Sequence, residues 1–174
     1  MQNHEYRIGK LHLSKESSVH APIQQKKVAF FVGMGNNYGP IKQDETLVFD
    51  KVVTNIGGAF DDKTGIFTAP HNGTYEFTIV VSAQGRQKAA AMLMKGRQMI
   101  FTVWAESIPF WATATNRAIL NLQQDDQIRV VLMSQASFLY GYMYSTFSGY
   151  MLFEDSSGDI CRIKLQVISL EFDQ

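Results

Sequence analysis

The sequence predicts an all-β domain, folded as a sandwich or a barrel. From Val28 onward, short apolar segments are interrupted by Gly, Asn, Asp or Pro every eight to twelve residues, a spacing typical of these folds. The chain also contains twelve Phe and seven Tyr residues, which favour strands. Its single cysteine, Cys161, excludes an internal disulfide framework. Packing of the core must therefore stabilise the fold.

Nine segments are predicted to form strands. They are residues 28–34, 46–55, 65–70, 73–83, 88–96, 98–105, 117–123, 127–133 and 145–155. Segment 88–96, KAAAMLMKG, has helix-forming residues, but it is too short to nucleate a helix comfortably and lies between strands. We therefore predict that it is a strand as well.

Turns separate these segments, and each has a residue type that suits a chain reversal. The turn dipeptides are Gly57-Gly58, Asn72-Gly73 and Asp125-Asp126. We expect positive φ at Gly57, Gly65 and Gly73, where a Cβ atom would be strained. Pro70 cannot donate a ladder hydrogen bond and should end its strand.

Composition limits the classes of partner. The chain has 16 basic and 16 acidic residues, so neither a nucleic-acid groove nor a polybasic membrane patch is expected. The longest apolar runs are strand-sized, far below the roughly 18 residues of a membrane span, so no membrane insertion is expected. Residues 1–27 are polar, lack the apolar core of a secretory signal and are predicted to be a tail.

Two stretches carry a family resemblance. Residues 48–77 read VFDKVVTNIGGAFDDKTGIFTAPHNGTYEF and residues 144–155 read YSTFSGYMLFED. Their Phe-Asp strand, Thr-Gly-x-Phe-x-x-Pro turn, Gly-x-Tyr-x-Phe strand and closing Phe-Ser-Gly strand resemble the complement C1q globular-domain family, and the last stretch is similar to its cerebellin branch. The resemblance implies a ten-stranded jelly-roll sandwich of the C1q and tumour-necrosis-factor type, assembled as an extracellular homotrimer.

This resemblance places the globular domain at residues 28–155. Residues 156–174 form an extension whose alternating apolar residues suggest either an extra edge strand or a tail that binds a partner. Cys161 within it either bridges subunits or remains a free thiol. Inside the domain, the largest predicted core residues are Phe49, Phe67, Tyr75, Phe77 and Phe147, each stabilising the fold by about 1.5–3 kcal/mol when fully buried.

Calcium is the one cofactor that the resemblance raises, because several family members bind it near the trimer apex through Asp side chains. At the corresponding positions this chain has Trp104 and Ala112, and the nearby acid is Glu106. One carboxylate per subunit leaves a threefold ring open as an alternative, but a solvated loop residue is favoured. We therefore predict no cofactor and no metal ligand, and the scattered tail histidines do not change this.

Two aromatic segments are the predicted ligand-binding sites. The first, WAESIPFW at 104–111, contributes Trp104, Glu106, Phe110 and Trp111, and the second, FLYGYMY at 138–144, contributes Tyr140, Tyr142 and Tyr144. Exposed aromatic residues dominate binding hot spots, and Tyr-rich loops suit adaptable recognition. The alternative for both segments is packing between the subunits of a trimer.

The sequence offers no case for catalysis, since no nucleophile-elbow pattern such as G-x-S-x-G is present. The leading functional prediction is a non-catalytic, lectin-like or pattern-recognition head of innate immunity that binds a glycan or a protein. The alternative is a signalling ligand, similar to the cerebellins or the tumour-necrosis-factor cytokines, that engages a cell-surface receptor. Asn72-Gly73-Thr74 matches the N-glycosylation acceptor pattern in a predicted surface turn.

Overall fold

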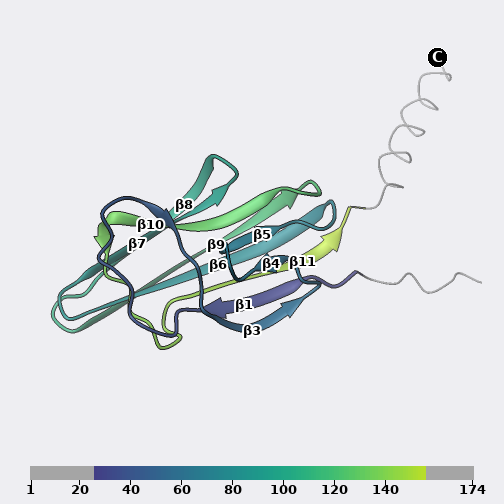
Figure 1. Cartoon of the computed structure of the whole chain (residues 1–174). Helices are drawn as coiled ribbons and strands as arrows, with labels where there is room; N and C mark the ends of the chain where they lie inside the picture. Colours follow the sequence, from purple (N-terminus) through teal and green to yellow (C-terminus); the bar gives the residue numbers. More distant parts are fainter. Residues whose placement is uncertain (1–25, 156–174) are drawn as a thin grey trace, which may run out of the picture.

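The computed structural model describes residues 26–155, which fold as a sandwich of two antiparallel sheets (Figure 1). One sheet has the strand order β3-β1-β11-β6-β9, and the other has the order β4-β5-β10-β7-β8, with β2 also paired to β10. The strands are β1 (Ala29–Gly33), β2 (Glu45–Thr46), β3 (Lys51–Ile56), β4 (Phe60–Asp61), β5 (Ile66–Thr68), β6 (Gly73–Gln84), β7 (Lys88–Lys95), β8 (Gln98–Glu106), β9 (Trp111–Leu122), β10 (Gln127–Ser137) and β11 (Thr146–Glu154). The predicted all-β jelly-roll sandwich is confirmed. Its shortest strands are β2 and β4, which have two residues each.

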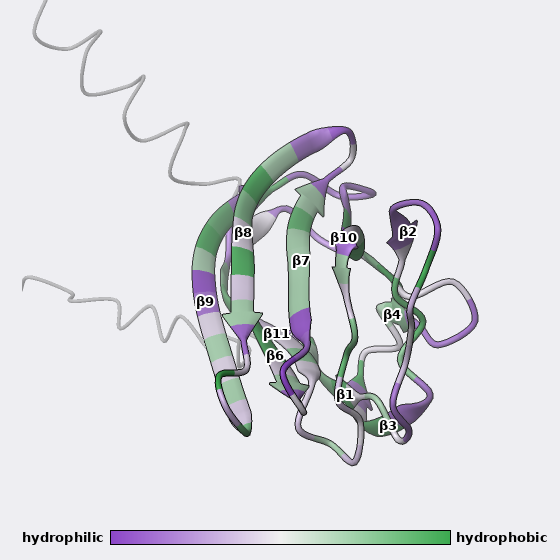
Figure 2. Cartoon of the chain, turned by 90° about the vertical axis from the view of Figure 1, so that its left-hand side faces the viewer, coloured by the Kyte–Doolittle hydropathy of each residue, from purple (hydrophilic) through white to green (hydrophobic). Residues whose placement is uncertain are grey.

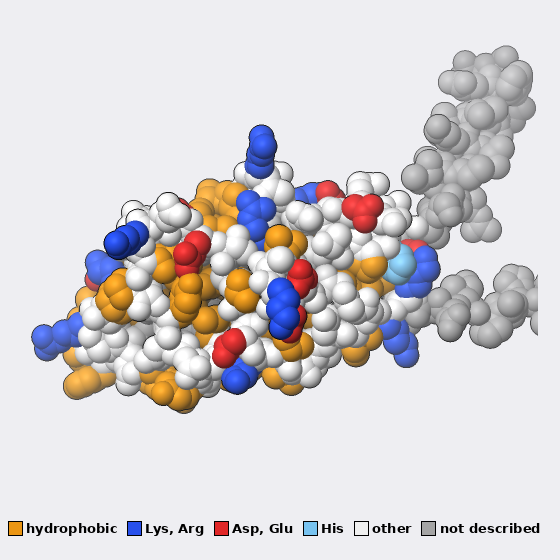
Figure 3. Space-filling model, viewed as in Figure 1, with side chains coloured by type: hydrophobic (Ala, Val, Ile, Leu, Met, Phe, Trp, Pro, Cys, Tyr) orange, Lys and Arg blue, Asp and Glu red, His pale blue; other side chains and the backbone are white. Residues whose placement is uncertain are grey.

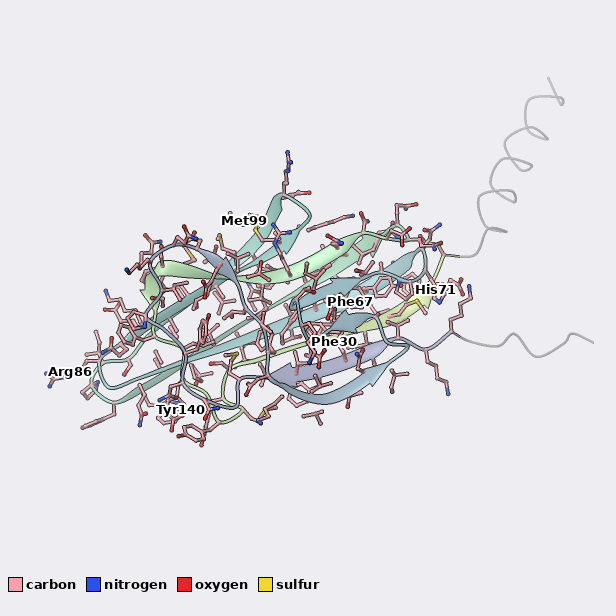
Figure 4. All side chains as sticks on the ribbon, in the orientation of Figure 1. Phe30, Phe67, His71, Arg86, Met99 and Tyr140 are labelled. Carbon is pink, nitrogen blue, oxygen red and sulfur yellow. The ribbon has the colours of Figure 1, made fainter. Side chains whose placement is uncertain are left out.

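The core lies between the two sheets, because alternate side chains of each strand point inward. Along β6 this alternation buries Tyr75, Phe77, Ile79 and Val81 almost completely. Phe30 in β1 then packs across the interior, with its ring centroid 5.4 Å from that of Phe67 (Figure 4). All five large aromatic residues predicted for the core are at most 1% exposed.

The packing around Gly149 in β11 explains why the closing Phe-Ser-Gly sequence has a glycine at this position. A Cβ atom at this position would lie 2.6 Å from the Phe77 ring and 2.7 Å from the Phe30 ring. Distances this short do not occur for real Cβ atoms, so a side chain here would displace the central rings. The glycine is thus needed for space rather than for an unusual backbone conformation.

The predicted strand at 46–55 is wrong as a single strand. The structure divides it into the end of β2 and most of β3, which belong to different sheets. Leu47 still donates its backbone N–H to Val130 O of β10 (2.9 Å), and the chain then crosses to pair Lys51–Ile56 with β1. Because Leu47 and Phe49 are both buried during this crossing, the alternation continues although the pairing partner changes.

Two further details differ from the sequence predictions. Strand β9 begins at Trp111, six residues before the predicted start at 117, because its first half alternates small inward residues with Thr and carries little hydrophobic signal. Gly57 and Gly65 have positive φ as predicted, but Gly73 does not. Gly73 instead allows a close approach, since a Cβ atom there would lie 2.6 Å from the Phe153 carbonyl oxygen.

The sandwich has two distinct ends. Residues 26 and 155 both lie at the end marked by His71 (Figures 1 and 4). The opposite end, here called the distal end, comprises the β6–β7 turn with Arg86, the β8–β9 turn and residues 138–144. Figure 2 views the molecule from this end and shows β8 and β9, the edge strands of the two sheets, lying side by side.

Several predictions concern the ends of the chain. Residues 1–25 of the predicted N-terminal tail (1–27) lie outside the described residues, as do the predicted extension 156–174 and Cys161 within it. Over residues 26–155, no helix has the length and apolar character that crossing a membrane would need.

Candidate functional site

Four aromatic side chains meet at the distal end and form what is here called the aromatic cluster: Trp111, Tyr140, Tyr142 and Tyr144. The Trp111 ring centroid lies 4.6 Å from that of Tyr140 and 4.8 Å from that of Tyr144, both in edge-on geometry. Tyr140 also contacts Tyr142 and Tyr144, at 5.6 and 5.4 Å. Edge-on aromatic pairs at these separations give more stabilisation than the burial of their apolar area alone. The structure therefore joins residues from both predicted aromatic segments.

The aromatic cluster is open to solvent on its outer side. Tyr142 is 62% exposed, Tyr144 50% and Trp111 40%, while Tyr140 is half-buried at the centre. In Figure 3, hydrophobic side chains reach the surface at the left-hand end of the molecule, which is the distal end. Such an exposed group of aromatic rings is typical of an interaction surface.

Two buried serines fix the backbone beneath the aromatic cluster. Ser145 Oγ donates to Tyr140 O at 2.7 Å and accepts the Ser82 backbone N–H at 3.1 Å. The Tyr140 N–H in turn donates to Ser82 O at 2.8 Å. Ser82 lies in β6 and also shares a 2.7 Å hydrogen bond with Thr113 of β9. These bonds attach the tyrosine-rich segment to the first sheet. The backbone that carries the rings is therefore held in place.

The segment then turns through an unusual conformation. Tyr142 and Met143 have φ values of 52° and 64°, and Tyr144 N–H donates to Gly141 O at 3.0 Å. Two successive residues with positive φ closed by this bond are the pattern of a type I′ turn, which normally contains Asn and Gly. Each L-residue in this region costs about 1–2 kcal/mol. Such backbone strain is concentrated at functional sites, and here it directs Tyr142 outward.

Beside the aromatic cluster, the β8–β9 turn presents an apolar tip. Ile108 is 75% exposed and Phe110 78% exposed, more than any other large hydrophobic residue of the described chain. The tip is held against the β6–β7 turn, because Gly85 N–H donates to Phe110 O at 3.0 Å and Ser107 N–H donates to Gln87 O at 2.9 Å. The predicted site residue Phe110 is thus exposed but stands outside the ring-to-ring contacts of the cluster.

Trp104 and Glu106 lie on β8 and take no part in the ring contacts of the aromatic cluster. Trp104 is 44% exposed on β8, opposite Ala90 of β7. The Glu106 carboxylate forms an ion pair with Lys88 at 3.0 Å. This pairing does not suit calcium, which requires six to eight oxygen ligands. Among the described residues, no group of three or more acidic, His or Cys side chains could hold a metal ion.

Asn72 lies in the turn before β6, at the end opposite to the aromatic cluster. The residue is exposed, and its Oδ1 accepts the backbone N–H of Gln124 at 2.7 Å. The nitrogen to which a glycan would be attached is not part of this bond. Glycosylation of Asn72 stays a prediction, and its position would leave the distal end uncovered.

A shallow pocket next to the aromatic cluster, here called the distal pocket, escaped the sequence analysis. It has a volume of about 110 Å³ and is lined by Asn37, Tyr38, Gly39, Gln84, Gln87, Phe138, Leu139 and Tyr140. Tyr140 belongs to both features. Although the aromatic character of residues 138–144 is plain in the sequence, nothing in the sequence connects this segment with residues 37–39 or 84–87, which come from other parts of the chain.

The distal pocket is built on a fixed backbone. Tyr38 and Leu139 exchange two backbone hydrogen bonds of 2.9 Å, and Phe138 N–H donates to Lys88 O at 3.0 Å. Gly39, with φ of 98°, allows the chain to approach so closely that a Cβ atom would lie 1.7 Å from Ser137 O. The Tyr38 hydroxyl donates to Glu45, and this bond raises the tyrosine pKa, so the hydroxyl stays protonated at neutral pH.

Fold and site together define a class of protein: a jelly-roll sandwich whose distal end carries exposed aromatic side chains on a hydrogen-bonded backbone. Comparison with known proteins identifies the family. The C1q domain model matches residues 29–152, so the chain belongs to the C1q domain family.

Curated relatives agree with this assignment. The chain is 33% identical to Caprin-2 of Danio rerio over 136 residues, covering 77% of this chain and 15% of that protein. It is 28% identical to complement C1q tumor necrosis factor-related protein 3 of Homo sapiens over 130 residues, covering 74% of this chain and 52% of that protein. The chain therefore spans about half of one of these relatives and a much smaller part of the other.

Solved structures support the fold alone. The globular domain of zebrafish complement 1qA protein matches with a TM-score of 0.62 at 18% identity, over 74% of this chain and 99% of that one. The tumour-necrosis-factor protein Eiger of S. frugiperda matches with a TM-score of 0.58 at 13% identity, over 76% of this chain and 97% of that one.

Proposed function

We propose that this chain is a non-catalytic, extracellular recognition head that assembles as a homotrimer and binds a glycan or protein ligand through its distal end. The observation that carries the proposal is the aromatic cluster, whose four rings contact one another while remaining open to solvent. The hydrogen bonds of Ser82 and Ser145 hold its backbone before any ligand arrives, which reduces the entropy cost of binding.

Self-association is supported by the outer face of the first sheet. Paired residues of five neighbouring strands form one row across this sheet, in the order Ile56, Ala29, Tyr150, Glu76 and Ile119. The large apolar members of this row, Ile56, Tyr150 and Ile119, are 50%, 44% and 60% exposed. A sheet face with this much large apolar surface favours contact with another subunit. A trimer would also place three aromatic clusters on one particle, and linked weak sites increase total binding.

Light scattering tests the assembly directly. We expect a particle of three times the 19.6 kDa chain mass, and we expect Ile119→Glu to reduce it towards one chain. Met99→Glu is the matched control, because Met99 is 54% exposed on β8 in the second sheet (Figure 4). A wild-type particle with the mass of one chain would contradict the trimer.

Ligand binding is tested on Trp111→Ala and Tyr144→Ala, with Met99→Ala as the control for loss of an exposed apolar side chain. A glycan array and a screen of cell-surface receptors provide the ligands. We expect both distal variants to lose binding by at least about tenfold, as hot-spot aromatic residues do, while Met99→Ala binds normally. Unchanged binding by both distal variants would exclude the aromatic cluster as the ligand site.

The second candidate function is a signalling ligand that engages a cell-surface receptor. It is favoured by Ile108 and Phe110, since two large apolar side chains this exposed suit an apolar cavity of a protein better than a hydrated glycan. If this function is correct, Phe110→Ala will abolish receptor binding in the screen and leave glycan binding unaffected.

A further inference from the structure

We propose that the distal pocket binds one neutral sugar ring, with amide side chains recognising its hydroxyl groups and an aromatic wall packing against its apolar face. This inference rests on the proposed recognition function and names its ligand class. It concerns residues that the aromatic cluster leaves unused: Tyr38, Gln84, Gln87 and Phe138, together with Asn37.

The polar lining of the pocket consists of neutral amides. Gln84 is exposed and Gln87 half-buried, and each amide can donate two hydrogen bonds and accept others. Asn37 also lines the pocket, and because its Oδ1 accepts the Gly141 N–H at 2.9 Å, this side chain would serve a ligand as a donor through its NH₂ group. A sugar hydroxyl both donates and accepts, and amides match this dual character better than charged side chains do.

The exposed apolar lining is aromatic, since the aliphatic Leu139 is buried. Tyr38 and Phe138 are each 39% exposed, and Tyr140 connects the pocket to the aromatic cluster. Rings that are only partly covered offer both a face for the C–H groups of a sugar and, in the tyrosines, a hydroxyl at the rim. The pocket therefore combines hydrogen-bonding and stacking surfaces within one cavity.

Charge argues against an ionic ligand. None of the side chains that line the pocket is charged. Two charged residues next to the lining are engaged with other groups, because Lys88 pairs with Glu106 at 3.0 Å and Glu45 accepts the Tyr38 hydroxyl. Arg86, at the exposed tip of the β6–β7 turn, does not line the pocket. A charged ligand would lose hydration without gaining an opposite charge, which is costly. Neutral sugars avoid this cost.

Size sets the extent of the ligand. The volume of about 110 Å³ is well below the roughly 300–1,000 Å³ of pockets that enclose drug-sized molecules, so it fits a single ring of a longer glycan. One such contact gives a dissociation constant on the order of 1 mM. Useful binding would then come from several pockets on one assembled particle.

Saturation-transfer NMR on the full chain tests this inference, with methyl glycosides of neutral hexoses and of N-acetylhexosamines as probes and the methyl glycoside of sialic acid as the charged comparison. We expect transfer to the ring C–H protons of a neutral probe. Gln84→Ala and Gln87→Ala should each weaken binding by at least about tenfold, because a missing partner leaves polar groups unpaired. Gln98→Ala is the matched control, an exposed glutamine at the start of β8. Equal unfolding midpoints for all variants verify that each one is folded.

The outcomes separate this inference from the proposed function. If no neutral probe binds, but a protein ligand binds and depends on Trp111 and not on Gln87, the sugar pocket is overturned and the recognition function stands. Binding of the sialic acid probe alone in the pocket also overturns the neutral-sugar assignment. If no probe binds and no ligand depends on the aromatic cluster, both proposals fail.

Discussion

Tyr142 provides a direct test of the strained turn beneath the candidate site. Its φ of 52° costs an L-residue about 1–2 kcal/mol, whereas glycine pays nothing there but loses about 0.4–1 kcal/mol more chain entropy on folding. Tyr142→Gly should therefore be more stable than Tyr142→Ala by about 0.5–1 kcal/mol. Both variants lack the aromatic ring, so the difference between their free energies of unfolding reports the effect of the backbone conformation alone.

Urea unfolding measures this difference, with both variants at the same protomer concentration because an oligomer's stability depends on it. The control pair is Tyr144→Gly and Tyr144→Ala, two residues further along and 50% exposed, where φ is not positive. There glycine should be the less stable choice by about 0.5–1 kcal/mol. If the glycine variant were less stable than the alanine variant at both positions, the left-handed conformation of Tyr142 would be refuted.

Three other predictions follow from the same structure. Phe77→Ala, which empties the centre of the core, should cost about 3–5 kcal/mol in urea unfolding. Asp126→Asn should cost less than about 1 kcal/mol at pH 7, because it removes a partly exposed ion pair with Lys95 at 2.8 Å. The hydrogen bond from Lys95 lowers the pKa of Asp126 in the folded state, so the advantage of the wild type is complete above about pH 4 and disappears as pH falls through that lower pKa. A pH series of unfolding midpoints measures this advantage, and an advantage that does not shrink as the pH falls below about 4 would contradict the assignment. Calcium or EDTA should leave the unfolding temperature unchanged, since Glu106 pairs with Lys88, whereas a rise with calcium would reveal a site that these residues do not explain.

Much of the fold was predictable because burial and turns are local signals. The alternation of Tyr75, Phe77 and their neighbours places one side of β6 in the core in whatever sheet the strand joins. Likewise, Gly57 marks a position of positive φ independently of its distant contacts. The crossing at Leu47 was not predictable, because alternation continues unchanged when a strand leaves one sheet and enters the other.

The candidate site was only partly predictable for a related reason. Trp111 and Tyr140 were identified as aromatic candidates, but their contact depends on the registers of β6 with β9 and of the loops around β10, which no local pattern fixes. Gln84 and Gln87 carry even less signal, since polar residues in a turn are ordinary. They become notable only when Tyr38 and Phe138 are found beside them.

The arrangement of the two ends supports the proposal that recognition takes place at the distal end. The first and last described residues, 26 and 155, lie at the end marked by His71. Asn72 follows His71 in the chain, so a glycan on this predicted acceptor would lie at the same end. At the distal end, the turns are fastened to one another and to β6 by the bonds of Gly85, Ser107 and Ser145. Rigid turns hold exposed rings at little entropy cost, and a trimer built on the first sheet would present three such surfaces together. The aromatic cluster and the distal pocket can then act on one ligand, because Tyr140 lies in both.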